Sequence, residues 1–119
     1  MSHKAQTLVI HCIDFRFHKM IDEDLKKRDL IGKFDRISWA GAAKDFKNVK
    51  NNAAISLKLH HPDETLIYEH EDCGAYGQDN STQTHRANAQ KLSAALLKIK
   101  PKLKVEILIA TFGGIKPLA

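Results

Sequence analysis

Four short apolar segments alternate with three helical segments along this chain, and that alternation limits the fold more than any other feature of the sequence. The apolar segments have the length of β-strands and cover residues 7–12, 34–39, 65–70 and 105–111. The segments between them repeat apolar residues at helical spacing and cover residues 17–29, 45–60 and 81–100. This order predicts an α/β fold with three layers, in which a mostly parallel sheet lies between helices and the crossovers are right-handed.

We expect four parallel strands in the order 2-1-3-4, numbered along the chain. A short fifth strand over 115–118 is expected at the sheet edge, because Gly113 and Gly114 predict a turn after the last apolar segment. Pro62 disfavours helix at the residue before it, so the helix over 45–60 is expected to stop there. That helix is expected to bury one broad apolar face made of Val49, Ala53, Ile55, Leu57 and Leu59.

Length and composition indicate one ordinary globular domain over residues 1–119. The hydrophobic fraction is 43% and the charged fraction is 28%, which is typical of a folded protein rather than a disordered one. No apolar run approaches the roughly 18 to 20 residues that span a bilayer. The N-terminal segment lacks the apolar core of a signal peptide, so we expect a cytoplasmic protein.

The net charge of +5 carries little functional information. Lysines at alternate positions over 98–104 form a basic stretch, but no aromatic residues are interleaved with them. We interpret the stretch as a solvated helix end, where lysines complement the helix dipole. The sequence therefore predicts neither a nucleic-acid partner nor a membrane partner, and the expected ligand is a small molecule.

Both cysteines lie in short polar segments that directly follow apolar strands. The first segment is Cys-Ile-Asp-Phe-Arg at 12–16, and the second is His-Glu-Asp-Cys-Gly at 70–74. Two thiolates and one imidazole are the donor set of a catalytic zinc site whose fourth position stays open. The alternative is that both cysteines are buried structural thiols, because free cysteine is among the most buried residue types.

The expected topology brings the two segments together. Open α/β sheets bind ligands beyond the carboxyl ends of their strands, at the point where the strand order reverses. Cys12 ends the first strand and His70 ends the third, so both residues lie at that point if these strands are neighbours. The position and the donor types thus favour the same metal site.

At these residues the chain resembles the β-class carbonic anhydrases. That family has a Cys-x-Asp-x-Arg segment after its first strand and a His-x-x-Cys-Gly segment after its third, and residues 12–16 and 70–74 match both patterns. Ala40 and Gly41 also resemble the Ala-Gly turn of the family. The resemblance covers most of the chain, including the last predicted parallel strand.

The resemblance implies a zinc lyase that interconverts CO2 and bicarbonate. It implies that Cys12, His70 and Cys73 hold Zn2+ and that a zinc-bound hydroxide attacks CO2, giving bicarbonate and a proton. Asp14 would accept a hydrogen bond from the hydroxide and orient it, while Arg16 would hold Asp14 ionised and away from the metal. Because family active sites lie where two subunits meet, the resemblance also implies a homodimer or a larger homo-oligomer.

Several alternatives stay open at this point. The same zinc site could hydrolyse CS2 or COS, as in some relatives with this fold, or Asp14 could close it as a fourth ligand in a non-catalytic zinc-binding module. Asp14 could also serve only as a helix cap. His18 is a candidate to relay protons to buffer. Glu69 departs from the family pattern, which usually has glycine before the metal-binding histidine, and its charge is expected to find a partner or solvent.

Overall fold

A computed structural model describes residues 3–119 of the chain. Within these residues the strands form one sheet in the order β2-β1-β3-β4-β5, with β1 to β4 parallel and β5 antiparallel to β4. The strands are β1 (Thr7–His11), β2 (Phe34–Ser38), β3 (Glu64–His70), β4 (Lys104–Thr111) and β5 (Gly114–Pro117). The predicted α/β fold, the strand order and the short edge strand are confirmed.

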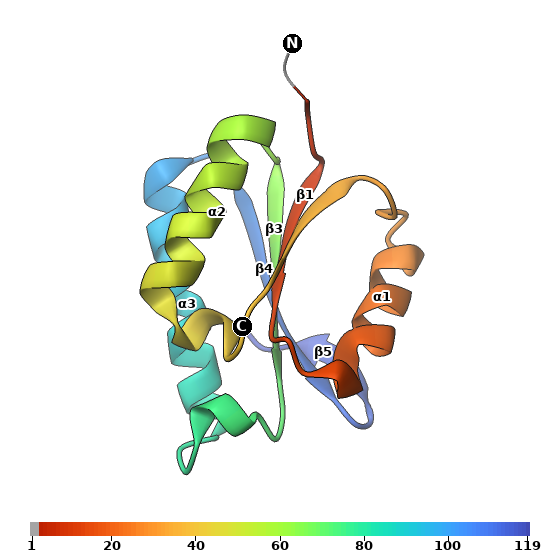
Figure 1. The fold of residues 1–119 in the computed structure, drawn as a ribbon, viewed down its shortest axis with the longest axis vertical. Helices are drawn as coiled ribbons and strands as arrows, with labels where there is room; N and C mark the ends of the chain where they lie inside the picture. Colours follow the sequence, from red (N-terminus) through yellow and green to blue (C-terminus); the bar gives the residue numbers. More distant parts are fainter. Residues whose placement is uncertain (1–2) are drawn as a thin grey trace.

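Helices cover both faces of the sheet, which gives the fold three layers (Figure 1). α1 (His18–Lys27) lies on one face, whereas α2 (Phe46–His60) and α3 (Thr82–Ile99) lie side by side on the other. Short 3-10 turns follow β1, β2 and β3, at Phe15–Phe17, Ala42–Lys44 and Gly74–Tyr76. None of the helices within residues 3–119 combines the length and the apolar character that crossing a bilayer requires.

The strands direct alternate side chains into two apolar cores. In β1, Leu8 and Ile10 belong to the core beneath α2 and α3, and Val9 belongs to the core beneath α1. β1 is buried along its whole length and β3 along nearly all of it. Strands covered on both faces need apolar residues at successive positions, which explains the continuous apolar runs in the sequence.

The carboxyl ends of β1 and β3 are neighbours in the middle of the sheet. Parallel pairing sets Ile10 of β1 opposite Ile67 of β3, while β2 pairs along the other side of β1. From these ends the chain continues to α1 on one face and to α3 on the other. The strand order therefore reverses between β1 and β3, at the position where open α/β sheets bind ligands.

The predicted helices and strands occur, with boundaries shifted by one or two residues. α1 ends at Lys27 because the chain turns there, and Asp29 has a left-handed φ of 58°. α2 ends at His60, since His61 is also left-handed with a φ of 50°, so the stop precedes Pro62 as expected. β1 ends at His11, which places Cys12 just beyond the strand.

The apolar face predicted for α2 is wrong at two of its five residues. Val49, Ala53 and Leu57 are buried against the sheet, but Ile55 and Leu59 are 56% and 55% exposed. An α-helix has about 3.6 residues per turn, so Ile55 and Leu59 project from the outer side of α2. Residues at positions i and i+2 cannot lie on the same face of a helix, which is why the prediction failed.

Candidate metal centre

Cys12, His70 and Cys73 meet at the carboxyl ends of β1 and β3. Their ligand atoms all lie within 4.8 Å of one another, and the three residues are buried. The two Sγ atoms are 4.0 Å apart, near the roughly 3.8 Å expected for two thiolates on a tetrahedral zinc ion with bonds of about 2.3 Å. Among residues 3–119, no other group of three such side chains converges in this way.

The imidazole of His70 is oriented for metal binding. Its Nδ1 lies 2.7 Å from the backbone oxygen of Glu71, and in the neutral ring donation to that carbonyl leaves Nε2 without a proton. Nε2 is buried and has no hydrogen-bond partner among the described residues. The ring also stacks on Phe17, with 4.6 Å between ring centres. A buried polar atom without a partner is costly, so this nitrogen fits a position that a cation would fill.

The turn after β2 supports the first thiol. The N–H of Gly41 donates to Sγ of Cys12 at 3.3 Å. Gly41 has a left-handed φ of 78°, and a Cβ added there would lie 3.2 Å from the Cβ of Ala75 in the segment that follows Cys73. Backbone conformation and close approach both require glycine at this position. The Ala-Gly pair noted in the sequence thus brings a backbone donor to a metal-ligand candidate.

The two thiols differ in how readily they ionise. Burial raises the pKa of Cys12, but the neighbouring His70 side chain and the Gly41 N–H outweigh it and bring this pKa down to about 7. Burial and the nearby charge of Cys12 raise the pKa of Cys73 to about 11. Metals bind the thiolate form, so binding would release a proton from Cys73. The donor types, their spacing and the unpartnered nitrogen together fit zinc.

Asp14 and Arg16 form an ion pair beside the three ligand candidates. Nη2 of Arg16 is 2.6 Å from Oδ2 of Asp14, and Nε donates to Oδ1 at 3.0 Å. Oδ1 also accepts the backbone N–H of Arg16, which caps the 3-10 turn after β1. The capping role and the ion pair therefore coexist. The Arg16 side chain lowers the pKa of Asp14 to about 2, so this carboxylate is charged near neutral pH.

Arg16 connects the two cysteine segments to each other. Its Nη1 is 2.9 Å from Oδ2 of Asp72, and Nη2 also donates to the backbone oxygen of Asp72 at 2.8 Å. Asp72 lies between His70 and Cys73 in the second segment. Oδ2 of Asp14 is 3.9 Å from Nε2 of His70, yet Asp14 is not one of the converging ligand atoms. The guanidinium thus holds Asp14 beside the metal-ligand candidates.

A cavity of about 400 Å3 lies against these residues and opens to solvent. Its lining comes from residues 12–16, Ala40 and residues 73–75. Phe15 lines it and is 82% exposed, so it is not a core residue. Phe17 and Trp39 do not line this cavity and pack with the apolar cores.

Glu69, the residue that departs from the family pattern, is buried behind the ligand candidates. Only 2% of it is exposed. Its Oε1 accepts a hydrogen bond from the Tyr76 hydroxyl at 2.5 Å and lies 2.8 Å from Nδ1 of His85, which is also buried. The expected partner for this charge thus exists. The sequence did not identify either partner, because Tyr76 lies in the 3-10 turn after β3 and His85 belongs to α3.

His18 does not join the site. Its ring packs edge-on against His11, with 5.2 Å between ring centres. Among the described contacts, none links His18 to Asp14 or to the three ligand candidates. A proton relay through His18 stays a prediction from sequence.

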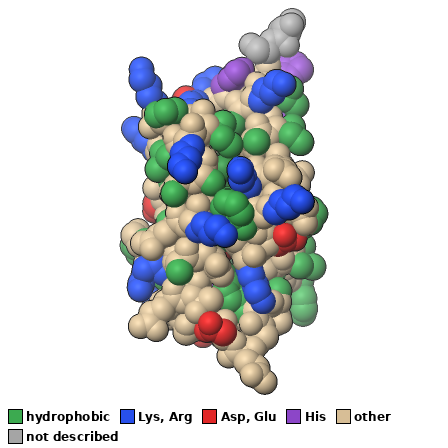
Figure 2. Space-filling model, turned by 90° about the vertical axis from the view of Figure 1, so that its left-hand side faces the viewer, with side chains coloured by type: hydrophobic (Ala, Val, Ile, Leu, Met, Phe, Trp, Pro, Cys, Tyr) green, Lys and Arg blue, Asp and Glu red, His purple; other side chains and the backbone are tan. Residues whose placement is uncertain are grey.

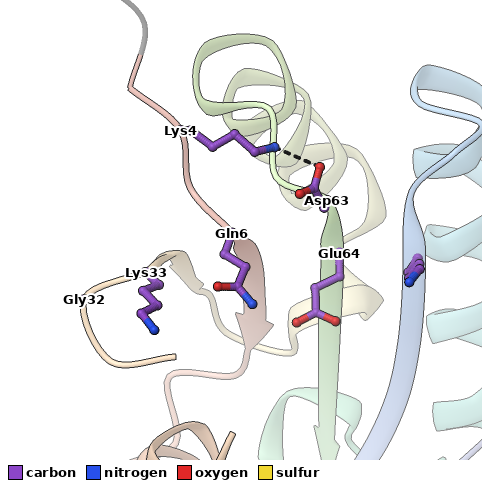
Figure 3. Close-up of a pocket in the computed structure, with 7 residues that line it drawn as sticks. Lys4, Gln6, Gly32, Lys33, Asp63 and Glu64 are labelled. Atoms are coloured by element: carbon purple, nitrogen blue, oxygen red, sulfur yellow. Dashed lines mark hydrogen bonds and ion pairs between the residues drawn. The ribbon is translucent and has the colours of Figure 1, made fainter. Parts of the chain in front are cut away.

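A larger hollow lies at the opposite end of the sheet, where the parallel strands begin (Figure 3). It measures about 570 Å3 and is lined by residues that include Lys4, Lys33, Asp63 and Glu64. Its charged groups largely pair with their neighbours: Lys4 is 2.8 Å from Asp63, and Lys33 is 3.1 Å from Asp29. No metal-ligand cluster lies there among the described residues, so the smaller cavity at the strand ends is the better candidate site.

Comparison with known families gives a match over nearly the whole chain. The model of the family described as "Putative carbonic anhydrase" matches residues 1–111. An uncharacterised protein of Rickettsia conorii is 27% identical, over 95% of this chain and 71% of its own length. An uncharacterised protein of Rickettsia bellii is 25% identical, over 95% of this chain and 80% of its own.

Solved structures show the same fold. The crystal structure of a carbonic anhydrase from Streptococcus mutans superposes with a TM-score of 0.71 at 16% identity, over 99% of this chain and 84% of that one. A β-carbonic anhydrase of Aspergillus fumigatus superposes with a TM-score of 0.60 at 15% identity, over 98% of this chain and 77% of that one. At these identities the likeness concerns the fold.

Proposed function

Because this chain belongs to the carbonic anhydrase family whose model matches residues 1–111, we propose that it catalyses the reversible hydration of CO2 to bicarbonate and a proton. The α/β fold is that of β-carbonic anhydrases. The single observation that carries the proposal is the convergence of Cys12, His70 and Cys73 next to the Asp14–Arg16 ion pair. The metal ligands and the acceptor for the attacking water can be assigned to these five residues.

Cys12, His70 and Cys73 would hold Zn2+. When bound, zinc supplies a Lewis acid that lowers the pKa of a coordinated water toward about 7. The protein holds the donors ready for the ion: the Glu71 carbonyl orients the imidazole of His70, and the Gly41 N–H stabilises the Cys12 thiolate. Such support reduces the rearrangement that metal binding requires.

Asp14 would accept the hydrogen bond from the attacking water. Its carboxylate is ionised near neutral pH, because the Arg16 side chain lowers its pKa to about 2. An acceptor at this position can orient a water molecule so that a lone pair points toward CO2. The two bonds from Arg16 to Asp72 anchor the guanidinium, and this anchoring would keep Asp14 from turning onto a bound metal. This anchoring supports an open, catalytic site over a zinc-binding module closed by Asp14.

Stopped-flow CO2 hydration tests the proposal on purified protein whose zinc content has been measured. We expect about one zinc per chain and a rate that rises with pH across roughly pH 6.5 to 9, as the bound water ionises. Cys73→Ser is expected to lose both zinc and activity. Asp22→Asn, which changes an exposed carboxylate on α1, is the matched control and is expected to keep both.

The experiment distinguishes a wrong reaction from a wrong ligand assignment. A zinc-loaded protein without CO2 hydration at any pH would contradict the reaction but leave the metal site standing. Full zinc occupancy in Cys73→Ser would contradict the ligand assignment instead.

We also propose a cytoplasmic homodimer that forms around the rim of the cavity. Ile13 and Phe15 are large, exposed apolar residues that line the cavity, and the exposed ring of Phe112 lies 5.6 Å from the guanidinium of Arg16, another lining residue. Exposed apolar groups that gather at one place are typical of interaction sites. Light scattering coupled to size exclusion is expected to give about twice the 13.4 kDa chain mass. Phe15→Ser is expected to shift the protein to monomers, whereas Ile55→Ser, an exposed apolar residue elsewhere, is the control.

A further inference from the structure

The outer side of α2 and α3 has a one-sided charge composition. Neither the 15 residues of α2 nor the 18 residues of α3 include an aspartate or a glutamate. The lysines on these helices are Lys47, Lys50, Lys58, Lys91 and Lys98. Figure 2 views this side of the molecule and shows basic side chains spread over it, with hydrophobic ones between them and few acidic ones. Two adjacent helices thus form one extended basic surface.

Apolar side chains are exposed among these lysines. Ile55 and Leu59 project from α2, and Leu97 and Ile99 are exposed on α3. Between the helices a groove of about 430 Å3 is lined by Phe46, Ala94, Ala95 and Ile99 together with Lys50, Lys91 and Lys98. We call the five lysines and these exposed apolar residues the α2/α3 surface.

Contacts within the fold account for little of the α2/α3 surface, although Lys50 and Lys91 lie 5.7 Å and 4.3 Å from the ring centre of Phe46. Among the described residues, none of its five lysines forms an ion pair. The core residues of both helices face the sheet, and the metal-ligand candidates lie at the strand ends. The proposed reaction does not use this side of the molecule.

We propose that the α2/α3 surface binds the surface of an anionic lipid bilayer, with the two helices lying in the plane of the membrane. Lysine ammonium groups attract anionic headgroups, and apolar side chains between them enter the boundary between headgroups and acyl chains. Lysine stems are long enough to keep their charges at the headgroups while the neighbouring apolar groups are inserted.

The composition favours lipid over other polyanions. Protein interfaces are depleted in lysine and enriched in arginine and aromatic residues, and nucleic-acid surfaces use arginine forks and stacking rings. Arg86, the arginine of the two helices, donates to the backbone oxygen of Leu118. Phe46 is half-buried, and the ammonium of Lys91 lies 4.3 Å from its ring centre. The charged and large apolar side chains that are accessible there are therefore lysines and branched aliphatic residues.

This proposal departs from the sequence-based prediction that the chain has no membrane partner. That prediction rested on the lack of a run long enough to span a bilayer. Binding at the surface requires no such run, only a face on which basic and apolar groups are combined.

Vesicle flotation tests the proposal on the full-length protein. The probe is a vesicle of phosphatidylcholine with about 30% phosphatidylserine, compared with pure phosphatidylcholine at about 0.1 M salt. We expect binding to the anionic vesicles, loss of binding at high salt, and little binding to the neutral ones. Each lysine near an anionic surface contributes about fivefold to partitioning, so Lys58→Glu with Lys98→Glu is expected to weaken binding at least 25-fold.

A matched variant separates a specific surface from net charge. Lys26→Glu with Lys27→Glu makes the same change in charge on exposed lysines of α1, on the other side of the sheet, and is expected to keep most of the binding. Thermal melting shows whether each variant is folded.

Three outcomes would overturn the proposal. They are no binding to anionic vesicles, equal losses in the two double variants, and tighter binding to double-stranded DNA than to vesicles at the same salt. The last outcome would assign the surface to nucleic acid.

Discussion

Two carboxylates flank the metal-ligand candidates, and the protein stabilises them in opposite ways. Asp14 lies at the cavity, where the charged guanidinium of Arg16 holds it with several hydrogen bonds. Glu69 lies behind the ligands, where it is buried and its partners are the Tyr76 hydroxyl and the His85 ring. Asp14 has a strong partner at the edge of solvent. Glu69, inside the core, has two partners on Oε1 and none on Oε2 among the described residues.

The contrast indicates that Asp14 serves the reaction and that Glu69 serves the stability of the fold. A partly exposed ion pair is screened by water and contributes little to stability, so Asp14 can change its hydrogen bonds during a reaction at small cost. A buried carboxylate oxygen that loses a hydrogen-bond partner carries the full desolvation penalty of an unsatisfied acceptor. Glu69 should therefore govern folding, and Asp14 should govern turnover.

The largest effect is expected from removing the imidazole partner of Glu69. His85→Ala leaves a buried carboxylate short of one hydrogen-bond partner, so the free energy of unfolding should fall by about 3 kcal/mol. Urea unfolding of the zinc-free protein measures it. His60→Ala is the control, because His60 pairs with Asp35 at 2.7 Å where both side chains are partly exposed, and less than about 1 kcal/mol is expected. Equal losses would refute the contrast between buried and exposed pairs.

The second effect concerns turnover rather than stability. Asp14→Asn removes the anionic acceptor, and CO2 hydration is expected to slow about 100-fold. The zinc content should stay near one per chain, and the free energy of unfolding should change by less than about 1 kcal/mol. Unchanged turnover would remove Asp14 from the mechanism, and loss of zinc would show that it is a ligand.

A smaller loss is expected when the second partner of Glu69 is removed. Tyr76→Phe deletes the hydroxyl that donates to Glu69 but keeps the ring, so about 1.5 kcal/mol of unfolding free energy should be lost. Tyr68→Phe is a matched control: its hydroxyl donates to Asp24 at 2.6 Å, and Asp24 keeps Arg28 at 2.9 Å as a second partner. A greater loss in Tyr68→Phe would contradict the special position of Glu69.

The smallest effect is expected in how the free energy of unfolding depends on pH in the acid range. The pKa of Asp14 is about 2 in the folded chain, below its usual 3.8, so its stabilising contribution is complete above about pH 3.8 and disappears as the pH falls through about 2. Arg16→Ala should return this pKa toward its usual value. The stability difference between wild type and Arg16→Ala should therefore narrow from pH 6 to pH 2.5 in urea unfolding. A constant difference would show that Arg16 acts through packing alone.

The metal-ligand candidates could be predicted from sequence because each belongs to a short motif at the end of an apolar strand. Once β1 and β3 are neighbours, Cys12 and His70 must come close, whatever the details of the loops. The partners of Glu69 had no such signal. His85 lies 16 residues further along the chain, and its side chain reaches Glu69 only after α3 has packed on the sheet.

The exposure of Ile55 and Leu59 shows a different limit of sequence analysis. Their apolar character suggested burial, but the phase of the helix decides which side chains face the core. The two residues follow Ala53 and Leu57 by two positions each, which turns them toward the outside. A count of apolar residues that ignores the rotation of about 100° per residue along the helix cannot separate buried from exposed positions.

The two cysteines could cross-link distant parts of the chain through a shared metal ion, and this cross-link would depend on the concentration of that ion. They are 61 residues apart, and closing a loop of that length in an unfolded chain costs about 4 kcal/mol of conformational entropy. A bound cation would tie β1 to the segment after β3, much as a disulfide would, except that the tie is reversible. The resistance of the fold to heat would then rise with the free concentration of the ion. The melting temperature of the chain would thus report the free zinc concentration around it.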